Sequence, residues 1–361
     1  MKSRARLREA LYFLALLAAA SALLLHPEVA SGAVVEGLRL CGGVILPSLF
    51  PFFVCAALMT ELSLTHIPAR LFAPVMRPLF HVGGAGSAAL ALGLLGGYPA
   101  GAQVTVQLYK SGCVTRQEAE RLLCFCNNAG PAFLLGVTGV GVYGSVRVGL
   151  LLWGVHVLCA FLTGVLLRGH KASPQSDACA QSASSRRGPT PFASAFTASV
   201  RHAGAAAMQV CMFVVIFSVL AAFLLCLLPP ATPPALRALA VGMLELSNGV
   251  CLLEGRRTLP LAAFLLGFSG LSVAAQAQSL LAGSGLSFRR YLPAKLLHGA
   301  LSALLMWPLS ALPAVQDAAV PAFSGAALPL AALYVPLWAA GGIICLVFRK
   351  LMAGNPPPKR V

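Results

Sequence analysis

The sequence predicts an all-α, polytopic integral membrane protein. Its 361 residues are 58% hydrophobic and only 10% charged, whereas a soluble globular protein carries roughly a quarter charged residues. Several apolar runs are also about 20 residues long, which is the length of helix that crosses the hydrocarbon of a bilayer. Because too few polar side chains remain to cover a water-facing surface, these observations exclude a cytosolic enzyme and a disordered chain.

The predicted spans are the long apolar runs, taken from the N-terminus. They cover residues 9–25, 38–62, 122–143, 148–167, 204–228, 295–312 and 324–348. Four basic residues precede the first run in a pattern that resembles a signal peptide. Because further apolar runs follow, we interpret this segment as an uncleaved first span.

The formal net charge is +16, from 26 Lys and Arg against 10 Asp and Glu. The basic residues stand singly between apolar runs, which is typical of topology signals and of contacts with lipid headgroups. We therefore expect membrane lipids as neighbours and no nucleic-acid partner. The 11 cysteines and seven histidines have neither metal-ligand spacing nor a matching acid, so we expect no metal, no cofactor and no enzymatic activity.

Two apolar stretches are too interrupted to be ordinary spans. Residues 85–109 are broken by the sequence GGYPAG at 96–101, and residues 259–282 are broken by GFSGLS at 267–272. Each arm has about ten residues, or half the hydrocarbon thickness, and glycine and proline disfavour a continuous helix. We interpret both stretches as re-entrant helical hairpins; the alternative is one kinked full span in each place.

The chain divides into two similar halves. An N-terminal span and loop (1–37) precede a first repeat (38–168), a polar cytoplasmic linker (169–203), a second repeat (204–312), and a C-terminal span with a basic tail (313–361). Residues 92–123 align with 266–297, and amphipathic stretches at 67–80 and 234–254 precede the two hairpins. Paired broken elements in corresponding halves indicate a transporter site. The sequence thus predicts two inverted repeats, each with an amphipathic helix, a re-entrant hairpin and a broken span.

The charge distribution conflicts with this topology. With a cytoplasmic N-terminus, 14 Lys and Arg lie inside and 12 lie outside, which is a poor positive-inside bias. If residues 235–253 span the membrane instead, only Arg39, Arg147 and Arg237 lie outside. That alternative makes the repeats parallel and places Glu245 in mid-membrane. Whether 235–253 spans the membrane or lies at its interface stays open.

The candidate substrate site consists of polar groups and helix ends at the breaks. Helical segments that start near Pro99 and Pro131 present N–H groups and a partial positive charge, which suit a carboxylate. Polar side chains in the second half supply corresponding groups, and Glu245 is the acidic one among them. The predicted set is Gly96, Gly97, Tyr98, Pro99, Gly101, Gln103, Asn127, Asn128, Gly130, Pro131, Glu245, Ser247, Asn248, Ser269, Gly270, Ser272 and Gln276. The alternative is that these polar groups only join helices to one another.

The chain resembles the sporulation integral membrane protein YlbJ family, whose members carry nucleoside-recognition gate domains. The similarity rests on 96–101, on Thr115, Glu118 and Ala119, on CNNAGP at 126–131, and on residues around 43–52 and 245–249. Gate domains are in turn similar to halves of concentrative nucleoside transporters, which implies an inverted-repeat fold with two re-entrant hairpins. Those transporters carry a Gly-Gln-Thr-Glu hairpin motif, whereas the tip here reads GYPAGAQ and has no carboxylate.

The resemblance also implies a role in endospore formation. The YlbJ-like family is associated with moving dipicolinate, a planar dianion, from the mother cell toward the forespore. We therefore expect a multi-pass protein of the bacterial cell membrane, in the mother cell, that carries a small organic anion by alternating access. The alternatives are a nucleoside-type transporter or sensor and a non-transporting scaffold for spore assembly. The coupling ion and a homo-oligomeric state stay open.

Overall fold

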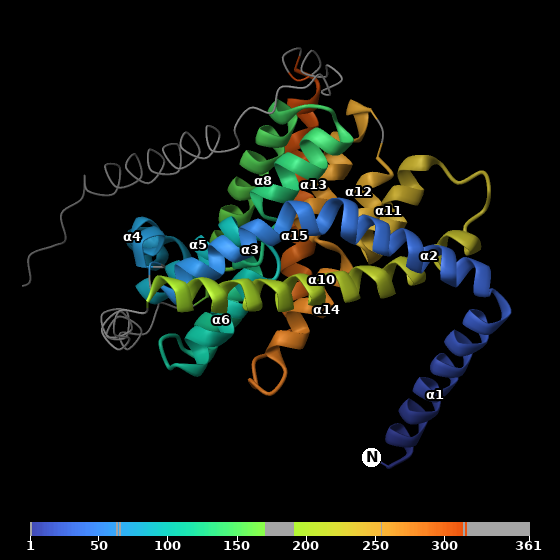
Figure 1. The fold of residues 1–361 in the computed structure, drawn as a ribbon, viewed down its shortest axis with the longest axis horizontal. Coiled ribbons are helices and arrows are strands. Elements are labelled where there is room, and N and C mark those ends of the chain that lie inside the picture. Colours follow the sequence, from blue (N-terminus) through green and yellow to red (C-terminus); the bar gives the residue numbers. More distant parts are fainter. Residues whose placement is uncertain are drawn as a thin grey trace, which may run out of the picture.

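The computed structural model describes residues 2–62, 64, 66–169, 191–253, 255–312 and 315. Within these ranges the chain is helical and contains no strand, as the ribbon shows (Figure 1). The prediction of an all-α fold is confirmed. The predicted span at 324–348, the basic tail and linker residues 170–190 lie outside the described residues.

The helices of the first half run from the N-terminus to α8. They are α1 (Lys2–Leu25), α2 (Pro27–Leu40), the π-helical turn η1 (Cys41–Ile45), α3 (Leu46–Glu61), α4 (His66–Val75), η2 (Met76–Phe80), η3 (Gly84–Gly86), α5 (Ser87–Gly96), α6 (Ala100–Lys110), α7 (Arg116–Cys126), the π-helix η4 (Ala132–Val142) and α8 (Val146–Leu166). Those of the second half are α10 (Phe192–Leu227), α11 (Pro234–Leu244), α12 (Leu246–Cys251), η5 (Arg256–Thr258), α13 (Leu259–Phe268), α14 (Gly270–Leu281) and α15 (Tyr291–Ser310).

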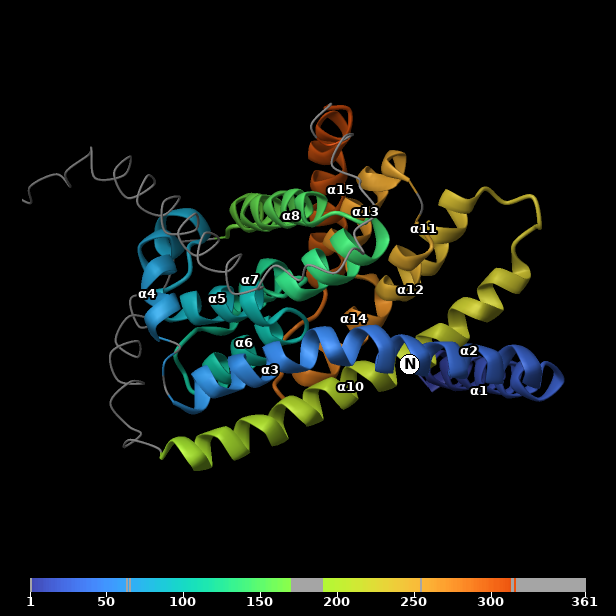
Figure 2. The ribbon, with the colours of Figure 1, turned by 45° about the horizontal axis from the view of Figure 1, so that its top comes forward.

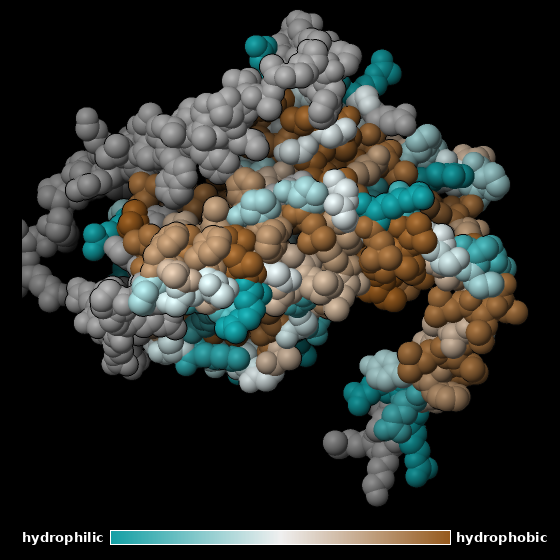
Figure 3. All heavy atoms as spheres, viewed as in Figure 1, coloured by the Kyte–Doolittle hydropathy of each residue, from teal (hydrophilic) through white to brown (hydrophobic). Residues whose placement is uncertain are grey.

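Several helices are long and apolar enough to cross a membrane. In the described part of the chain these are Arg6–Leu25, Val146–Leu166, Phe192–Leu227 and Arg256–Leu281, and a fifth span results if α2 and α3, bent by 59°, count as one. Large apolar side chains such as Phe13, Met212 and Leu227 are exposed. Figure 3 shows a hydrophobic middle of α1 with hydrophilic residues toward its N-terminal end. Such surfaces suit lipid.

The first hairpin forms where it was predicted. Helix α5 ends at Gly96, Gly97 turns the backbone with φ +73°, and α6 begins at Ala100 and packs back along α5. A Cβ atom on Gly93 would lie 3.1 Å from the Cα atom of Gly101. The two arms therefore touch through glycine backbone.

The second hairpin lies earlier in the chain than predicted. A Cβ atom on Gly249 would lie only 2.1 Å from the Cα atom of Gly242, whereas residues seven apart in a straight helix are about 10.5 Å apart. Helices α11 and α12 therefore fold back on each other at Glu245. Residues 234–251, predicted as an amphipathic stretch, form this hairpin.

The hairpin predicted over 259–282 is wrong. Helices α13 and α14 belong to one apolar run, Arg256–Leu281, that is long enough to cross a membrane, and Figure 1 shows α14 extending away from α13 instead of packing beside it. The glycine-rich motif interrupts this run at Ser269 and Gly270, which both have φ +75°. Two left-handed residues break the helical hydrogen bonding, yet they do not reverse the chain direction here.

With this correction both halves show the same order of elements. Hairpin α5–α6 is followed by the broken segment α7–η4 and then α8, and hairpin α11–α12 is followed by the broken span α13–α14 and then α15. The contacts between halves are reciprocal, since α6 packs on α14 and α12 packs on η4. The inverted relation between the halves stays a prediction that this order supports.

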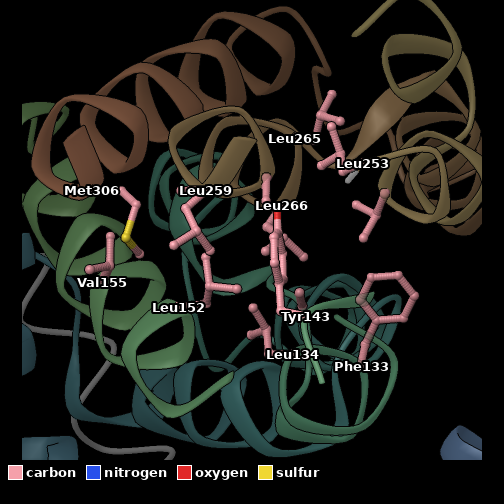
Figure 4. Packing of buried hydrophobic residues seen from close by; sticks show 14 of the residues in the cluster. Phe133, Leu134, Tyr143, Leu152, Val155, Leu253, Leu259, Leu265, Leu266 and Met306 are labelled. Carbon is pink, nitrogen blue, oxygen red and sulfur yellow. The ribbon is translucent and has the colours of Figure 1, made fainter. Parts of the chain in front are cut away.

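The long helices hold the hairpins in place. Helices α2 and α3 lie along α10 in both views (Figures 1 and 2). On the other side, Leu259 and Leu266 of α13 belong to one buried cluster with Leu134 of η4 and Leu152 of α8 (Figure 4).

Helix α10 begins at Phe192, so residues 192–203, predicted as linker, are helical. Their alanine-rich sequence favours this state.

At its open end, the first hairpin is fastened to α7 by a buried carboxylate. Glu118 accepts hydrogen bonds from the Thr115 amide at 2.9 Å and from the Gly83 amide at 3.1 Å. Thr115 in turn caps α7 through its side chain. This capping box ties the start of the broken segment to the chain that enters α5.

The corrected elements also remove the charge conflict. If the N-terminus is cytoplasmic, the chain crosses the membrane from the outside to the cytoplasm along α13–α14. The two ends of this span therefore lie on opposite faces of the membrane. Five described basic residues then lie outside: Arg39, Arg147, Arg237, Arg256 and Arg257. Thirteen lie inside: Lys2, Arg4, Arg6, Arg8, Arg70, Arg77, Lys110, Arg116, Arg121, Arg168, Arg201, Arg289 and Arg290. This bias agrees with the positive-inside rule and is compatible with the predicted inverted repeats.

We predict that the two ends of α13–α14 are accessible from opposite sides of the membrane. In a background in which the exposed Cys55, Cys226 and Cys251 are replaced by serine, a membrane-impermeant maleimide should label Arg257→Cys in intact cells. It should label Arg289→Cys only after permeabilisation. Labelling of both positions from one side would restore the hairpin at 259–282 and contradict the crossing.

Candidate functional site

A pocket lies where the hairpin tips and the breaks of both halves meet. Its empty volume, open mouth included, is ≈ 480 Å³. It is lined by Ile45, Leu49, Gly96, Gly97, Tyr98, Gly130, Phe133, Val210, Val214, Glu245, Leu246, Ser247, Val273 and Gln276. The wall is therefore mostly apolar, with a few polar groups.

The first-half wall is built by direct contact between two stretches of backbone. A Cβ atom on Gly97, at the hairpin tip, would lie 2.9 Å from the amide nitrogen of Gly130 in the break that follows α7. Glycine at both positions lets the tip reach the break. Tyr98 then extends across to the second half, where its hydroxyl donates to the carbonyl of Leu266 at 3.0 Å.

The second-half wall repeats this arrangement. A Cβ atom on Gly270, in the break between α13 and α14, would lie 3.0 Å from the carbonyl oxygen of Gly242 and 3.1 Å from the amide nitrogen of Leu246. These atoms belong to the tip of hairpin α11–α12. In both halves, then, the hairpin tip presses against the break of the next segment in the chain.

Glu245 is the acidic group of the pocket. Its side chain caps α12, because Oε2 accepts a hydrogen bond of 2.7 Å from the amide of Asn248. The residue is 1% exposed. Among the described residues, no Lys, Arg or His nitrogen lies within 4.0 Å of the carboxylate. A buried carboxylate of this kind is costly and indicates a functional role.

Gln276 is the polar group that α14 contributes to the pocket. It is buried, and its amide nitrogen lies 3.5 Å from the hydroxyl of Ser272 one turn earlier. Its carbonyl oxygen, Oε1, has no hydrogen-bond partner among the described residues. An amide that lines a pocket with an unused acceptor can bind a donor group of a ligand.

A buried cluster of polar side chains lies behind Tyr98. The Nζ atom of Lys295 donates to the carbonyl of Asn127 at 2.9 Å and lies 3.3 Å from Nδ1 of His298. It is also 5.6 Å from the centroid of the Tyr98 ring. The side-chain amide of Asn127 donates to the hydroxyl of Tyr291 at 2.7 Å. Lys295 therefore places a basic side chain at the centre and donates to the carboxyl end of α7.

The hydrogen bonds fix the tautomers of the two histidines in this cluster. The Ala129 amide donates to Nε2 of His156 at 3.2 Å, which places the proton of a neutral His156 on Nδ1. Nε2 of His298 lies 3.0 Å from the carbonyl of His156 and donates to it. Nδ1 of His298 is then free to accept from Lys295. The cluster thus contains two neutral imidazoles beside the amine of Lys295.

Three kinds of group set the charge balance at the centre: helix ends, Lys295 and Glu245. Helices α6, η4 and α14 begin at the tip or at a break, and none has an acidic residue in its first turn. The carboxyl ends of α5, α7, α11 and α13 reach the same region and offset these dipoles. A protonated Lys295 would add a whole positive charge to this balance, and a charged Glu245 would add a negative one.

The structure brings together seven of the predicted site residues and leaves the others around them. Those that line the pocket are Gly96, Gly97, Tyr98, Gly130, Glu245, Ser247 and Gln276. Gln103 is exposed on α6. Asn128 donates to the carbonyl of Phe125 at 2.7 Å, and Asn248 donates to the hydroxyl of Ser218 at 2.6 Å. Ser269 donates to the carbonyl of Phe268.

The remaining predicted residues have structural positions. Gly101 packs on the carbonyl of Cys126, Pro99 precedes α6, and Pro131 precedes η4. Asn127 bonds Tyr291, Gly270 contacts the second hairpin tip, and Ser272 contacts Gln276. These groups do not line the pocket, but they hold the segments whose residues do.

The sequence interpretation missed the polar face of α15. Tyr291, Lys295, His298 and Ser302 are all buried and recur at positions i, i+4, i+7 and i+11 of one helix. That spacing places them on a single face. A lysine and a histidine on one face of an otherwise apolar run would have been the signal. No group of three or more His, Cys, Asp or Glu in the described chain could hold a metal ion.

Comparison with known proteins places these elements in a family. A family model described as "Gate: Nucleoside recognition" matches residues 43–153, which include hairpin α5–α6 and the α7–η4 segment. The chain is 30% identical over 324 residues to the sporulation integral membrane protein YlbJ of Bacillus subtilis (strain 168), and the match covers 78% of each chain. No solved structure matches.

We predict that Gly101→Ala destabilises the protein. A Cβ atom there would lie 1.9 Å from the backbone carbonyl oxygen of Cys126, so either the hairpin or the break must shift. Such overpacking costs about 1–3 kcal/mol of unfolding free energy. A lower melting temperature of the purified protein in detergent checks this. Gly154→Ala in α8, where a Cβ meets nothing within 4 Å, is the control. Equal melting temperatures of the two variants would contradict the close contact.

Proposed function

The chain belongs to the YlbJ family of sporulation integral membrane proteins, and from this premise we propose that it transports a small organic anion during endospore formation. Dipicolinate is the proposed substrate, and the mother-cell membrane around the forespore is the proposed location. The transport cycle would be alternating access, in which the hairpin tips of the two halves open the site to one face at a time.

The observation that carries this proposal is the position of the pocket. Its wall includes the tip of each hairpin, at Gly97 and at Glu245, and residues from the broken segment of each half, at Gly130 and Gln276. A site shared by two halves can open to either face when one half moves against the other. The reciprocal packing of α6 on α14 and of α12 on η4 supports such a motion.

The charges favour an anionic substrate. The Lys295 ammonium lies behind the Tyr98 ring, and no described carboxylate lies within 4.0 Å of it. In a site of low dielectric constant, a positive charge that only the Tyr98 ring separates from the pocket attracts a carboxylate. The rings of Tyr98 and Phe133, which both line the pocket, suit the flat face of an aromatic acid.

A nucleoside is the second candidate substrate. The family model that covers residues 43–153 is described as nucleoside recognition, and the amide of Gln276 suits a base or a sugar hydroxyl. A nucleoside carries no charge, so Lys295 would contribute little to its binding. The two substrates therefore predict different responses to removal of the ammonium.

We predict that Gln276→Glu lowers uptake of labelled dipicolinate into proteoliposomes at least about tenfold, because a new carboxylate in the pocket repels the substrate carboxylates. Gln278→Glu on the same helix is the matched control, since Gln278 is exposed, and it should keep normal uptake. Equal uptake by the two variants would remove the pocket from the transport path.

We predict that Lys295→Met raises the KM for dipicolinate by about tenfold or more, through loss of the positive charge near the pocket. Uridine and adenosine, added as competitors, should displace little labelled dipicolinate from the unmodified protein. Lys110→Met at the exposed end of α6 is the control and should keep the normal KM. An unchanged KM in the Lys295 variant, together with strong competition by nucleosides, would favour the second candidate.

A further inference from the structure

The proposed function leaves one group in the pocket without a use. Glu245 lines the pocket, is 1% exposed and lies at the tip of hairpin α11–α12. A carboxylate in the wall of an anion site works against binding as long as it is charged. Its presence there calls for a role other than attraction of the substrate.

The surroundings of Glu245 contain no cation that would hold it in its charged form. Its Oε2 atom accepts the Asn248 amide at 2.7 Å. The titratable groups that face it are the thiols of Cys41 on η1 and Cys251 on α12; Cys211, on α10, lies next to Cys41. The neighbouring helices α13 and α14 and the π-helix η4 contain no ionisable side chain.

Two basic residues on helices around the pocket have partners other than Glu245 among the described residues. Arg237, on α11, donates to the carbonyls of Thr232, Pro229 and Pro230 at the outer start of that helix. Lys295 donates to Asn127 and contacts His298. Tyr98, which shares the pocket wall, donates to Leu266. None of these groups pairs with Glu245.

Anion binding and protonation of Glu245 are therefore linked. Two negative charges in one pocket repel each other more strongly than they do in water, because the effective dielectric constant there is low. A bound anion thus favours the protonated side chain, and by reciprocity a proton on Glu245 favours the anion. An empty pocket that opens to water lets the proton leave again.

We propose that Glu245 is the proton-coupling group of the transporter, which makes the protein a proton–anion symporter. This inference rests on the proposed function. An aqueous proton binds one carboxylate oxygen of Glu245 when the anion enters, and the same O–H bond releases its proton to water on the other face when the anion leaves. One proton accompanies each anion, and no electron is transferred. Protonation keeps one oxygen free to accept the Asn248 amide, so the cap on α12 persists.

The test measures accumulation by the full-length protein in proteoliposomes, with the membrane potential clamped at zero. For one proton per anion, the plateau ratio of internal to external labelled dipicolinate should rise about tenfold per unit of pH when the outside is acidic. Glu245→Gln, whose amide oxygen can still cap α12, should give a plateau ratio near one at every pH gradient. A plateau ratio does not depend on the transport rate.

Glu61→Gln is the matched control. Glu61 lies at the end of α3, paired with His202 at 3.2 Å, and the variant should respond to the pH gradient as the unmodified protein does. A Glu245→Gln variant that still accumulates dipicolinate along the pH gradient overturns the inference. So does an unmodified protein that follows a sodium gradient and ignores a pH gradient.

A second measurement needs no variant and covers the case in which Glu245→Gln fails to fold. Dipicolinate added to the purified unmodified protein in weak buffer should cause uptake of about one proton per anion bound, followed with a pH indicator. Binding without proton uptake overturns the coupling role and leaves anion transport intact. Absence of both binding and uptake of dipicolinate by the unmodified protein overturns the proposed function itself.

Discussion

The fold depends on one constraint: a peptide group that leaves the helical hydrogen-bond pattern inside a membrane needs a partner within the protein. Each break in this chain meets that need with a group from elsewhere. Lys295 donates to the carbonyl of Asn127, His156 accepts the Ala129 amide, and Tyr98 donates to the carbonyl of Leu266. The breaks therefore lie beside one another and beside the hairpin tips, and the pocket is the space left where they meet.

This constraint blurs the division between structural and binding groups. Asn127 and Asn128 are engaged with Tyr291 and Phe125, so they hold the first break in shape and do not point freely into the pocket. The side chains that remain for a ligand are fewer: Gln276, Ser247 and Glu245, together with the backbone at Gly97 and Gly130. Substitutions at the asparagines would act on the substrate through the geometry of the break. Their side-chain oxygens have no hydrogen-bond partner among the described residues, so substrate binding and the joining of helices both stay predictions for these two residues.

Much of the architecture could be predicted from hydrophobic run length and from glycine and proline. These features locate the first hairpin, the break at 127–131 and the interruption at 267–272, because they report where a helix fails. They do not report the direction in which the chain continues. The second hairpin turns at Glu245 and Leu246, with its glycines in the arms at Gly242 and Gly249, whereas the glycine-rich motif at Ser269 and Gly270 merely interrupts a crossing helix. Only the contacts of these glycines distinguish the two cases, since Gly249 meets Gly242 across the hairpin, whereas Gly270 meets the backbone of Gly242 and Leu246. The poor positive-inside bias of the predicted topology was the sign that the second hairpin had been placed in the wrong one of these two segments.

The separation of Lys295 and Glu245 gives the site its character. A direct ion pair between them would satisfy both charges and leave the pocket indifferent to an anion. Instead, Lys295 contacts a carbonyl, an imidazole and an aromatic face. These neutral groups can stabilise a positive charge on its amine but do not neutralise it. Glu245 is held by a backbone amide, which a protonated carboxyl group can keep as well. Glu245 can lose its negative charge by taking up one proton, whereas no described carboxylate opposes Lys295. A pocket with that asymmetry binds an anion in one protonation state and releases it in the other, which is the property that a transporter driven by a proton gradient requires.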